Sequence, residues 1–355
     1  MKKSLFYSFA AFILTFSVSC GFSDQKTSSL EMRGADISFY DEINEKGGSY
    51  KIKGKEVQLF DVLKQADVNW IRLRLWVNPE KNYCNLEHTL KIAKSAKQAG
   101  FKLLLDFHYS DSWADPSQQT VPSKWSGLTL SQLESKVSEY TKDVLDNFMW
   151  NECLPDMVQV GNEITNGMLW PYGSVNGGNT SSLMTLVSSG CNTVRDISKD
   201  IKIMLHLDSG ADLEKCEWWF DEAEKYGIDF DVIGLSYYPF FHGTDLDKVS
   251  ENIPALKKRF SKEVVIAETS YPWTFSWNDN TQNQVGEGAE LIKDCPATVS
   301  GQKKYLKKME KLVIQSGGKG LFWWEPDSIS TEGFENALEN QCWFDFDGNW
   351  NGTGF

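Results

Sequence analysis

The segment NWIRLRLW, residues 69–76, decides the fold of this chain. Its side chains alternate between two kinds, with Ile71, Leu73 and Leu75 set against Arg72, Arg74 and Trp76. A period of two is typical of a β-strand, because successive side chains point to opposite faces. The pattern predicts a strand that packs its aliphatic face against helices and directs its arginines toward an interior axis, where buried arginines need acceptors.

Seven further apolar runs resemble this strand, and amphipathic stretches separate most of them. The runs are GADISF (34–39), FKLLLDFHY (101–109), DMVQVGNE (156–163), IKIMLHLD (201–208), FDVIGLSYY (230–238), EVVIAET (263–269) and KGLFWWEPD (319–327). Between them, NLEHTLKIAKSAKQAG (85–100) has helical spacing and a terminal glycine. Strands that alternate with helices predict parallel βαβ units, and eight of them predict an α/β fold, a single (β/α)8 TIM barrel.

Length and composition agree with one catalytic domain over residues 33–355. The chain has 355 residues, of which 41% are hydrophobic, enough to bury the core of one such barrel. We find no internal repeat and no second domain boundary in the sequence.

Most of the predicted strands end in polar or aromatic residues. These are Asp36 and Ser38, Arg74 and Trp76, His108 and Tyr109, Asn162 and Glu163, His206 and Asp208, Tyr237 and Tyr238, Glu268, and Trp324 and Glu325. In a parallel barrel the carboxyl ends of all strands lie on one face, where active sites are built. We therefore expect these residues to converge at a single site.

The first residues predict export. MKKSLFYSFAAFILTFSVSC has two lysines, a short apolar run and small residues before Cys20, which resembles a bacterial lipoprotein signal over residues 1–19 with lipid attachment at Cys20. Ser17 stands where such signals usually carry leucine, so simple secretion with an unmodified Cys20 stays an alternative. Residues 20–32 are polar and unpatterned and are expected to form a flexible tether. The hypothesis is an exported lipoprotein anchored to a membrane, at the outer membrane or cell surface.

Cysteine spacing and charge limit the partners. The six cysteines after Cys20 lie far apart without a CxxC pair, so zinc is not expected, and export permits disulfides without specifying any of the possible pairings. The formal net charge is −13, and removing Lys2 and Lys3 with the signal makes it −15. A surface this acidic disfavours nucleic acid and polyanionic substrates and favours a neutral partner. The protein is expected to be a monomer.

Several blocks together resemble the family 53 glycoside hydrolases, the endo-β-1,4-galactanases. They occur in family order from about Gly34 to Asp347: RGADIS, WIRLRLWVNP, LLLDFHYSDSWADP, VQVGNEITNG, IGLSYYP, IAETSYPW and FWWEP. The resemblance implies a retaining enzyme that hydrolyses neutral β-1,4-galactan, as in type I arabinogalactan and pectic galactan, with Glu163 as general acid/base and Glu268 as nucleophile. It also implies that Asn162 holds the sugar 2-hydroxyl.

The chemistry of glycoside hydrolysis suits two such glutamates. A retaining glycosidase needs two carboxyl groups roughly 5 to 5.5 Å apart, one protonated and one ionised. The acid should lie in the less polar or more negative setting, while hydrogen bonds and positive charge favour the ionised nucleophile. We expect Arg74 and Tyr237 to hold Glu268 ionised, although Arg74 could equally be structural, and we expect Arg72 to hold the core.

Further residues are candidates for substrate binding. Asp111 is the mouth carboxylate expected to contact sugar, and His108 resembles a sugar ligand of the family, whereas His206 could be a ligand or structural. An indole can stack on the C–H face of galactose. Trp324 resembles the floor for the cleaved sugar, and Trp113 is a candidate for a neighbouring subsite.

No cofactor is required by this chemistry. Bacterial members of the family can hold calcium in the loop after the seventh strand, but here that loop reads TFSWNDNTQNQVGEG, with one aspartate among asparagines. Hard cations prefer cages of charged oxygen ligands, so the loop does not support calcium, and we predict no metal ligands.

Two alternatives stay open. A related barrel endo-glycanase acting on β-mannan, xylan or cellulose would keep both glutamates while its loops choose the sugar. A non-catalytic glycan-binding lipoprotein is the second, and the presence of both Glu163 and Glu268 favours an enzyme over it.

Overall fold

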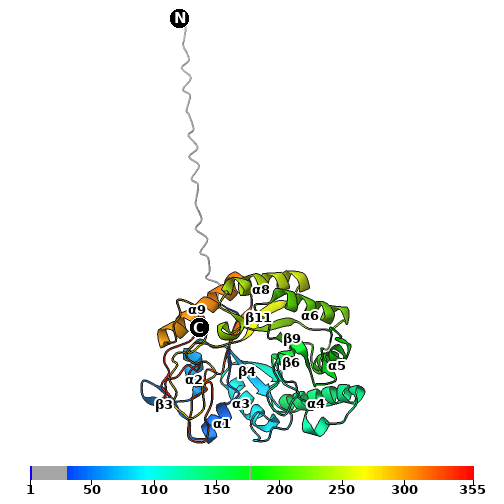
Figure 1. Cartoon of the computed structure of the whole chain (residues 1–355), viewed down its shortest axis with the longest axis horizontal. Helices are drawn as coiled ribbons and strands as arrows, with labels where there is room; N and C mark the ends of the chain where they lie inside the picture. The colour runs from blue at the N-terminus through cyan, green and yellow to red at the C-terminus, as the bar shows by residue number, and fades with distance from the viewer. Residues whose placement is uncertain (2–29, 176) are drawn as a thin grey trace.

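The computed structural model describes residues 1, 30–175 and 177–355, and within them eight parallel strands close into a barrel (Figure 1). The strand order is β1-β12-β11-β10-β9-β6-β5-β4, with β4 paired back to β1. Their bounds are β1 Met32–Asp36, β4 Trp70–Leu75, β5 Lys102–Phe107, β6 Met157–Val160, β9 Lys202–Leu207, β10 Val232–Ser236, β11 Glu263–Thr269 and β12 Gly320–Trp324. Seven of them lie within predicted runs, and β1 overlaps the run 34–39 but begins two residues earlier, so the predicted (β/α)8 barrel is confirmed.

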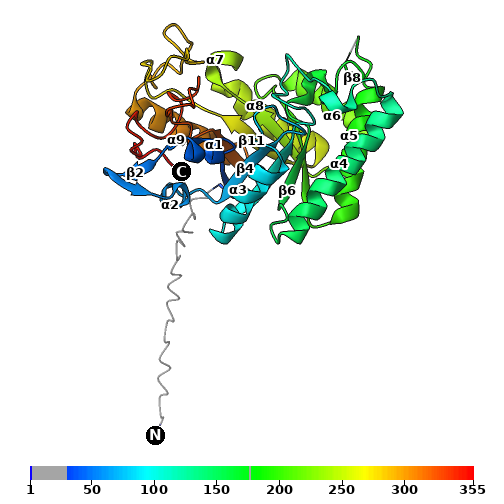
Figure 2. The ribbon, with the colours of Figure 1, turned by 90° about the horizontal axis from the view of Figure 1, so that it is seen from below.

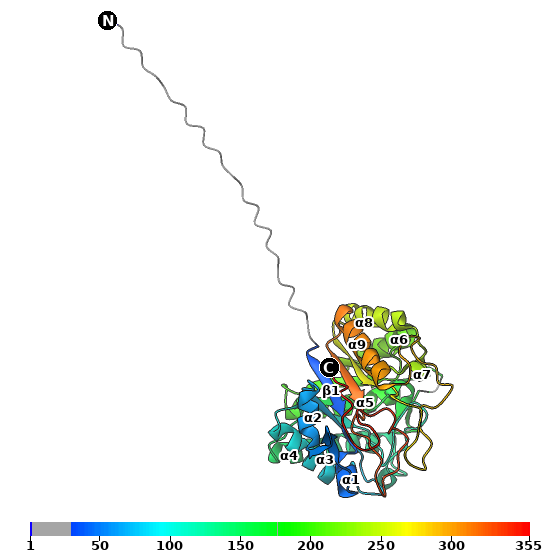
Figure 3. The same cartoon turned by 90° about the vertical axis from the view of Figure 1, so that its left-hand side faces the viewer.

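Helices surround this barrel, as Figures 1 and 3 show from two directions. They are α1 Tyr40–Glu45, α2 Leu59–Gln65, α3 Leu86–Gln98, α4 Leu130–Trp150, α5 Ser181–Ile197, α6 Leu213–Lys225, α7 Pro239–His242, α8 Leu246–Phe260 and α9 Val299–Gln315, with 3₁₀ turns at Ser123–Trp125 and Ile164–Asn166. The predicted helix in residues 85–100 is α3. The Asn85 side chain caps its start by accepting a hydrogen bond from the backbone N–H of His88, which has no partner within the helix. Two small antiparallel ribbons pair β2 Tyr50–Ile52 with β3 Lys55–Val57, and β7 Gly167–Met168 with β8 Gly173–Ser174.

The alternation along each strand separates two cores. Outward side chains such as Ile71, Leu73 and Leu75 belong to the large cluster that packs against the helices. Inward side chains at the lower end of the barrel form a second cluster: Met32, Trp70, Leu104, Met157, Met204, Val232, Val265, Ala267 and Phe322. Arg72 and Arg74 lie inward above this layer and are 1% exposed, as their parity in the sequence predicts.

An irregularity in β11 interrupts this alternation. Val264 and Ile266 belong to the outer core, while Val265 and Ala267 face the barrel axis. Strict alternation would turn Glu268 outward with Val264 and Ile266. The pairing with β10 instead shifts by one residue, from Leu235↔Ile266 to Ser236↔Glu268. A β-bulge re-aims a side chain in this way, and it directs Glu268 into the barrel mouth.

The mouth and the base of the barrel lie at opposite ends of the strands. In Figure 2, α7, β8 and the long loop after β11 gather at the upper end, which is the side of the strand carboxyl ends. The chain enters the barrel at the base, where Leu30 is buried and Met32 pairs with Gly320. The expected tether therefore ends earlier than residue 32, since Met32 belongs to β1.

Other sequence expectations differ in how far they can be compared with the structure. Residues 2–19 of the predicted signal, and Cys20, lie outside the described residues. Within those residues, each of the six cysteines carries a free, buried thiol. The described helices include none that is both long and apolar enough to cross a membrane.

Candidate active site

A cavity of about 730 Å³ opens at the carboxyl ends of the strands. Both predicted catalytic carboxylates line it, Glu163 after β6 and Glu268 in β11. Of the predicted substrate-binding residues, it also brings together Arg74, His108, Trp113, Asn162 and Trp324. The structure therefore joins segments of the chain that are far apart in sequence, as expected from their place at the strand ends.

Glu163 is held by an unusual backbone turn. Val160 ends β6, Gly161 has a φ of 83°, and Glu163 has a φ of 46° and a ψ of 50°, in the left-handed region. Such a conformation costs a non-glycine residue roughly 1–3 kcal/mol and is commonly found at functional sites. The amide of Gln119 donates to the carbonyl oxygen of Asn162 at 2.8 Å, which helps to hold the turn.

Glu268 is held by two direct partners. The Arg72 guanidinium lies 2.8 Å from its Oε1, and the Tyr238 hydroxyl donates to its Oε2 at 2.9 Å. A cation and a hydrogen bond to the charged form both favour the carboxylate. The environment of Glu268 therefore suits a nucleophile.

The two glutamates differ in how their pKa values are set. Burial, and then the charge of Glu268, raise the pKa of Glu163 well above its usual range, and the Ser236 hydrogen bond offsets this only in part. Burial also raises the pKa of Glu268, but Arg72 and then Tyr238 act against that rise. When two carboxyls share one site, the proton goes to the one with less compensation. The environment of Glu163 therefore suits the protonated member of the pair.

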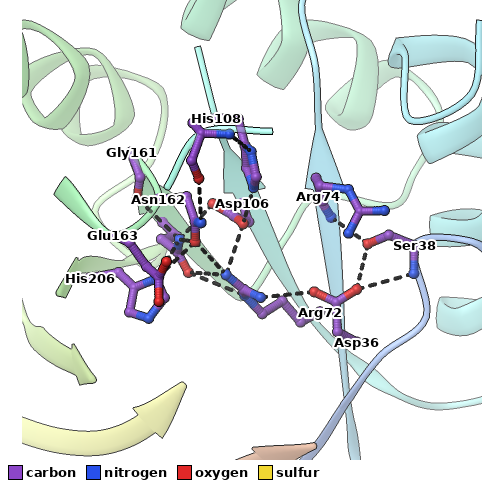
Figure 4. Close-up of polar contacts among 12 residues, drawn as sticks. Asp36, Ser38, Arg72, Arg74, Asp106, His108, Gly161, Asn162, Glu163 and His206 are labelled. Atoms are coloured by element: carbon purple, nitrogen blue, oxygen red, sulfur yellow. Dashed lines mark hydrogen bonds and ion pairs between the residues drawn. The ribbon is translucent and has the colours of Figure 1, made fainter. Parts of the chain in front are cut away.

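Arg72 organises the floor of the site (Figure 4). Besides Glu268, its guanidinium lies 2.9 Å from Asp36 and 2.8 Å from Asp106, and it donates to Asn162 Oδ1 at 2.9 Å. Burial disfavours its charge, yet the carboxylates of Asp106, Glu268 and Asp36 more than compensate and raise the pKa of Arg72. Arg72 therefore holds the core, as predicted, and it also makes the contact to Glu268 that the sequence predicts for Arg74.

Arg74 has a different partner from the one predicted. Its guanidinium lies 2.7 Å from Glu325 and stacks 4.1 Å from the ring centroid of Trp113. The prediction that Arg74 holds Glu268 is wrong, because Arg72 makes that ion pair. Arg72 lies two residues earlier in β4, on the same face of the strand. Arg74 instead supports the indole of Trp113 by a cation–π contact.

Tyr237 was also assigned a contact that belongs to its neighbour. Its hydroxyl donates to the carbonyl oxygen of Gly243 at 2.8 Å, and Tyr237 packs in the outer core. Tyr238, on the other face, supplies the hydrogen bond to Glu268. The parity of β10 could have identified this, because Ser236 faces inward and Tyr238 follows two residues later.

Aromatic side chains form one wall of the cavity. Trp324, at the end of β12, meets Trp113 edge-on at 6.0 Å and Tyr238 edge-on at 6.1 Å between ring centroids. All three line the cavity. The indoles of Trp113 and Trp324 thus lie where the apolar face of a sugar could stack, and their role as subsites stays a prediction.

Two predicted sugar ligands are occupied by protein groups. Both carboxylate oxygens of Asp111 accept backbone N–H groups, from Asn78 at 3.0 Å and Ser123 at 2.8 Å, so Asp111 holds loops instead of facing the cavity. His108 lines the cavity, but its Nδ1 accepts from the Ala114 N–H at 3.2 Å and its Nε2 lies 3.1 Å from Asp106. The ring of His108 therefore positions the loop that carries Trp113.

His206 lies behind the cavity wall and is fully buried. Its Nδ1 is 2.9 Å from Asn162 Oδ1, and its Nε2 is 2.9 Å from Ser236 Oγ. Of the two interpretations left open for His206, the structure supports the structural one. Phe241 and His242 of α7 also line the cavity, and the sequence interpretation had missed both because they follow a strand end in an irregular segment.

The single aspartate in the loop after β11, Asp279, is hydrogen-bonded to other groups of the protein. Asp279 Oδ1 accepts from the Thr281 N–H at 2.7 Å, and its Oδ2 accepts from the Ser330 hydroxyl at 2.6 Å and the Asn336 N–H at 2.8 Å. These hydrogen bonds tie the loop to the segment after β12. The donor set thus does not fit calcium, because both oxygens of the loop's single aspartate already serve protein donors.

Comparison with known proteins agrees with this geometry. The model of glycosyl hydrolase family 53 matches residues 32–352. The chain belongs to glycosyl hydrolase family 53. It is a glycoside hydrolase, and its closed parallel barrel is the fold of the family 53 structures that it resembles.

Relatives match over nearly the whole barrel. An arabinogalactan endo-β-1,4-galactanase of Cellvibrio japonicus is 38% identical over 326 residues, covering 88% of this chain and 86% of that protein. The Ignisphaera aggregans family 53 catalytic domain superposes with a TM-score of 0.87 at 35% identity, covering 92% of this chain and 95% of that one. A structure of fungal β-1,4-galactanases has a TM-score of 0.81 at 32% identity and covers 91% and 97%.

Proposed function

We propose that this family 53 enzyme hydrolyses internal bonds of β-1,4-galactan with retention of configuration. The observation that carries the proposal is the unequal environment of the two glutamates, with Arg72 and Tyr238 on Glu268 and burial beside a like charge on Glu163. The galactanase names of its relatives supply the sugar. A neutral polymer also suits a chain of net charge −13.

The first chemical step uses the glutamates in complementary roles. Protonated Glu163 gives its proton to the glycosidic oxygen while ionised Glu268 attacks the anomeric carbon, so that the leaving chain departs and a covalent glycosyl-enzyme forms. Arg72 and Tyr238 keep Glu268 aimed and ionised. Trp324 stacks on the sugar that is being cleaved.

The second step reverses the roles of Glu163. Its carboxylate takes a proton from a water molecule, and that water attacks the anomeric carbon and releases Glu268. Two inversions give net retention. The buried Asn162 amide, oriented by Arg72 and the Ala114 carbonyl, lines the cavity and can hold the 2-hydroxyl.

The polymer and the mode of cleavage can be tested with purified protein. We expect lupin or potato galactan to yield a series of intermediate oligosaccharides at the earliest times, and β-mannan, xylan and cellulose to yield little product. Release of galactose alone from the start would contradict endo cleavage. Faster hydrolysis of one of the other polymers would assign the sugar differently, and absence of hydrolysis with retained galactan binding would indicate a binding protein.

The roles of Glu163 and Glu268 can be separated by azide rescue. With a dinitrophenyl β-galactoside, whose leaving group needs no proton, Glu163→Ala should still form the intermediate and azide should give the β-azide. Glu268→Ala should be rescued by direct attack and give the α-azide. On galactan, Glu163→Gln should lose on the order of 10² to 10⁴ in rate. An α-azide from the Glu163 variant, or inverted products from galactan, would contradict a retaining pair with Glu163 as acid/base.

We further propose that the enzyme is exported and anchored through lipid on Cys20. The support is the lysine, apolar and small-residue pattern before that cysteine. Labelled palmitate should enter the protein expressed in a bacterial host and should fail to enter Cys20→Ala. Equal labelling of both, or labelling of neither, would contradict the anchor.

A further inference from the structure

The strand order leaves two arcs of the barrel between the catalytic glutamates. Glu268 lies in β11 and Glu163 follows β6, and on one side β10 and β9 separate them. On the other side lie β12, β1, β4 and β5, and this arc carries the indoles of Trp324 and Trp113. The function proposed above places the cleaved sugar in this second arc and assigns no substrate contact to the arc of β10 and β9.

The leaving part of the polymer belongs in the arc of β10 and β9. A glycosidic bond under attack lies between the two carboxyl groups, because one attacks the anomeric carbon and the other protonates the glycosidic oxygen. The polymer therefore crosses the line that joins Glu163 and Glu268. With Trp324 under the cleaved sugar in one arc, the leaving chain extends into the other.

A second cavity, of about 510 Å³, continues the first cavity on this side. Asp208 and His242 line both cavities, so the two cavities meet at these side chains. Beyond them the second cavity is lined by charged side chains of both signs, which are Asp212, Lys215, Lys248 and Glu251. A lining that offers both carboxylate acceptors and ammonium donors suits a neutral chain with many hydroxyl groups.

The position of the hydrogen on the His242 ring is fixed by a backbone donor. Nδ1 accepts the Tyr238 N–H at 2.9 Å, and a ring nitrogen that accepts a hydrogen bond carries no hydrogen of its own. The hydrogen of the ring is therefore on Nε2. Burial lowers the pKa of His242, in agreement with a neutral ring. Within the described residues Nε2 has no hydrogen-bond partner, so its N–H is available to a ligand in the cavities.

Asp208 supplies a complementary acceptor. Its Oδ1 accepts from the hydroxyl groups of Thr165 and Ser209, the latter at 3.0 Å. Its Oδ2 has no hydrogen-bond partner in the part of the chain that the structure describes. The junction of the two cavities thus offers one N–H donor and one carboxylate acceptor, and a sugar hydroxyl can bond to either of them.

Phe241 adds an apolar surface beside this pair. It precedes His242 in α7, lines the first cavity and is 58% exposed. Figure 2 shows α7 at the end of the barrel where the strands have their carboxyl ends. An exposed aromatic ring at this place can stack on the C–H face of a sugar.

We propose that Asp208 and His242 bind the sugar on the leaving side of the cleaved bond through its hydroxyl groups, and that Phe241 stacks on it. The second cavity holds the next sugars of the leaving chain. The ligand is neutral β-1,4-galactan, so this inference rests on the proposed function. In the second step an acceptor sugar bound here can replace water. Its hydroxyl oxygen attacks the anomeric carbon, Glu163 takes the hydroxyl proton, and the bond to Glu268 breaks.

Transfer to an added sugar measures this subsite separately from hydrolysis. With the dinitrophenyl β-galactoside as donor, the intermediate forms without a sugar on the leaving side, and β-1,4-galactobiose is added as acceptor. Water and galactobiose both need Glu163 as base, so the ratio of transfer to hydrolysis cancels changes in that residue. The unchanged enzyme should transfer to galactobiose. It should transfer more to galactotriose than to galactose, because longer acceptors reach the second cavity.

Two substitutions keep the internal hydrogen bonds and alter the contact with the sugar. His242→Asn can still accept the Tyr238 N–H but has no group in place of Nε2–H. Asp208→Asn can keep its oxygen toward Thr165 and then presents an NH₂ group in place of Oδ2. The transfer ratio should fall about 3- to 10-fold in His242→Asn and about 10- to 100-fold in Asp208→Asn. Release of dinitrophenolate should change far less.

Trp324→Ala, in the other arc, is the matched comparison. It should slow the release of dinitrophenolate and leave the transfer ratio in place, the reverse of the two substitutions above. Thermal unfolding confirms that each variant is folded.

Absence of transfer by the unchanged enzyme would overturn the inference, and so would an unchanged ratio in both folded variants or equal transfer to galactose and galactotriose. If the unchanged enzyme cleaved neither galactan nor the dinitrophenyl galactoside, or if it inverted configuration, the proposed function itself would fail.

Discussion

At the scale of single residues, adjacent positions in this chain carry opposite roles. Tyr237 faces the helices and bonds to the Gly243 carbonyl, whereas Tyr238 faces the axis and bonds to Glu268. The two differ by one step along the chain and therefore by one face of the strand. This pair offers a matched comparison for the setting of the nucleophile.

We predict that Tyr238→Phe moves the acidic limb of kcat/KM to higher pH. The hydroxyl lowers the pKa of Glu268, so its loss leaves a carboxyl that ionises at higher pH, by about one unit for a hydrogen bond to a charged group. Turnover on galactan should also fall. Tyr237→Phe is the control and should leave the acidic limb in place, and an equal shift in both variants would contradict the assignment.

The residue-scale errors of the sequence interpretation have a physical cause. Parity placed Arg72 and Arg74 correctly toward the axis, and the strand-end pattern found Glu163 and Glu268. The alternation of side chains along a strand shows which face a residue is on, but it does not show how far along the barrel axis its charged group lies. A guanidinium on a long side chain can contact residues of the neighbouring layer. Arg74 pairs in register with Asp106, yet the Arg72 guanidinium is the one that binds Asp106. Loop residues such as Asp111 have no periodicity, so their orientation could not be predicted from sequence.

At the scale of elements, β12 shows how one strand serves both the fold and the site. Trp323 is fully buried against Tyr305 and Trp343 on the helix side, and its Nε1 donates to the Gln341 carbonyl at 3.1 Å. Trp324 is on the other face and lines the cavity. Alternation of the strand thus assigns two neighbouring indoles to packing and to substrate.

We predict that alanine substitutions separate these functions. Trp324→Ala should reduce turnover severely with little change in thermal stability, because it removes stacking from the ring that distorts in the transition state. Trp323→Ala should instead cost about 3–5 kcal/mol of unfolding free energy. The two are measured by galactan hydrolysis and by denaturant unfolding. Normal turnover with lost stability in Trp324→Ala would show its indole to be core.

The strand β11 marks a limit of element-level prediction. Its run EVVIAET is readily recognised as a strand, and simple alternation along it would turn Glu268 toward the helices. The bulge opposite Leu235 and Ser236 reverses that orientation. No proline or glycine in the run signals the bulge, so the inward direction of Glu268 could be inferred only from its resemblance to other family members.

At the scale of the whole molecule, buried charge makes stability depend on pH. Asp327 is fully buried, and within the described residues both of its carboxylate oxygens have no hydrogen-bond partner. Burial raises the pKa of Asp327 well above its usual range. A carboxyl whose folded pKa is raised stabilises fully only below its unfolded pKa, near 4, and that contribution is lost as the pH rises through the folded pKa.

We predict that Asp327→Asn stabilises the enzyme at pH 7 by on the order of 1 kcal/mol, since the amide carries no charge to bury. The gain should disappear near pH 4, where the aspartic acid is neutral in both states. Asp36→Asn is a matched control, because it removes a buried partner of Arg72 and should destabilise at pH 7. Urea unfolding at the two pH values measures both. A destabilised Asp327→Asn at pH 7 would mean that the carboxylate has a favourable role.

The entry of the chain at the base of the barrel has a practical consequence. Leu30 and Met32 lie at the amino ends of the strands, and the cavity opens at their carboxyl ends. A bead or resin coupled through the segment before residue 30 would hold the enzyme with its cavity toward the flowing solution. Packed-bed columns of such material should therefore process long soluble polymers nearly as well as free protein does, whereas coupling through random surface lysines would block a fraction of the molecules.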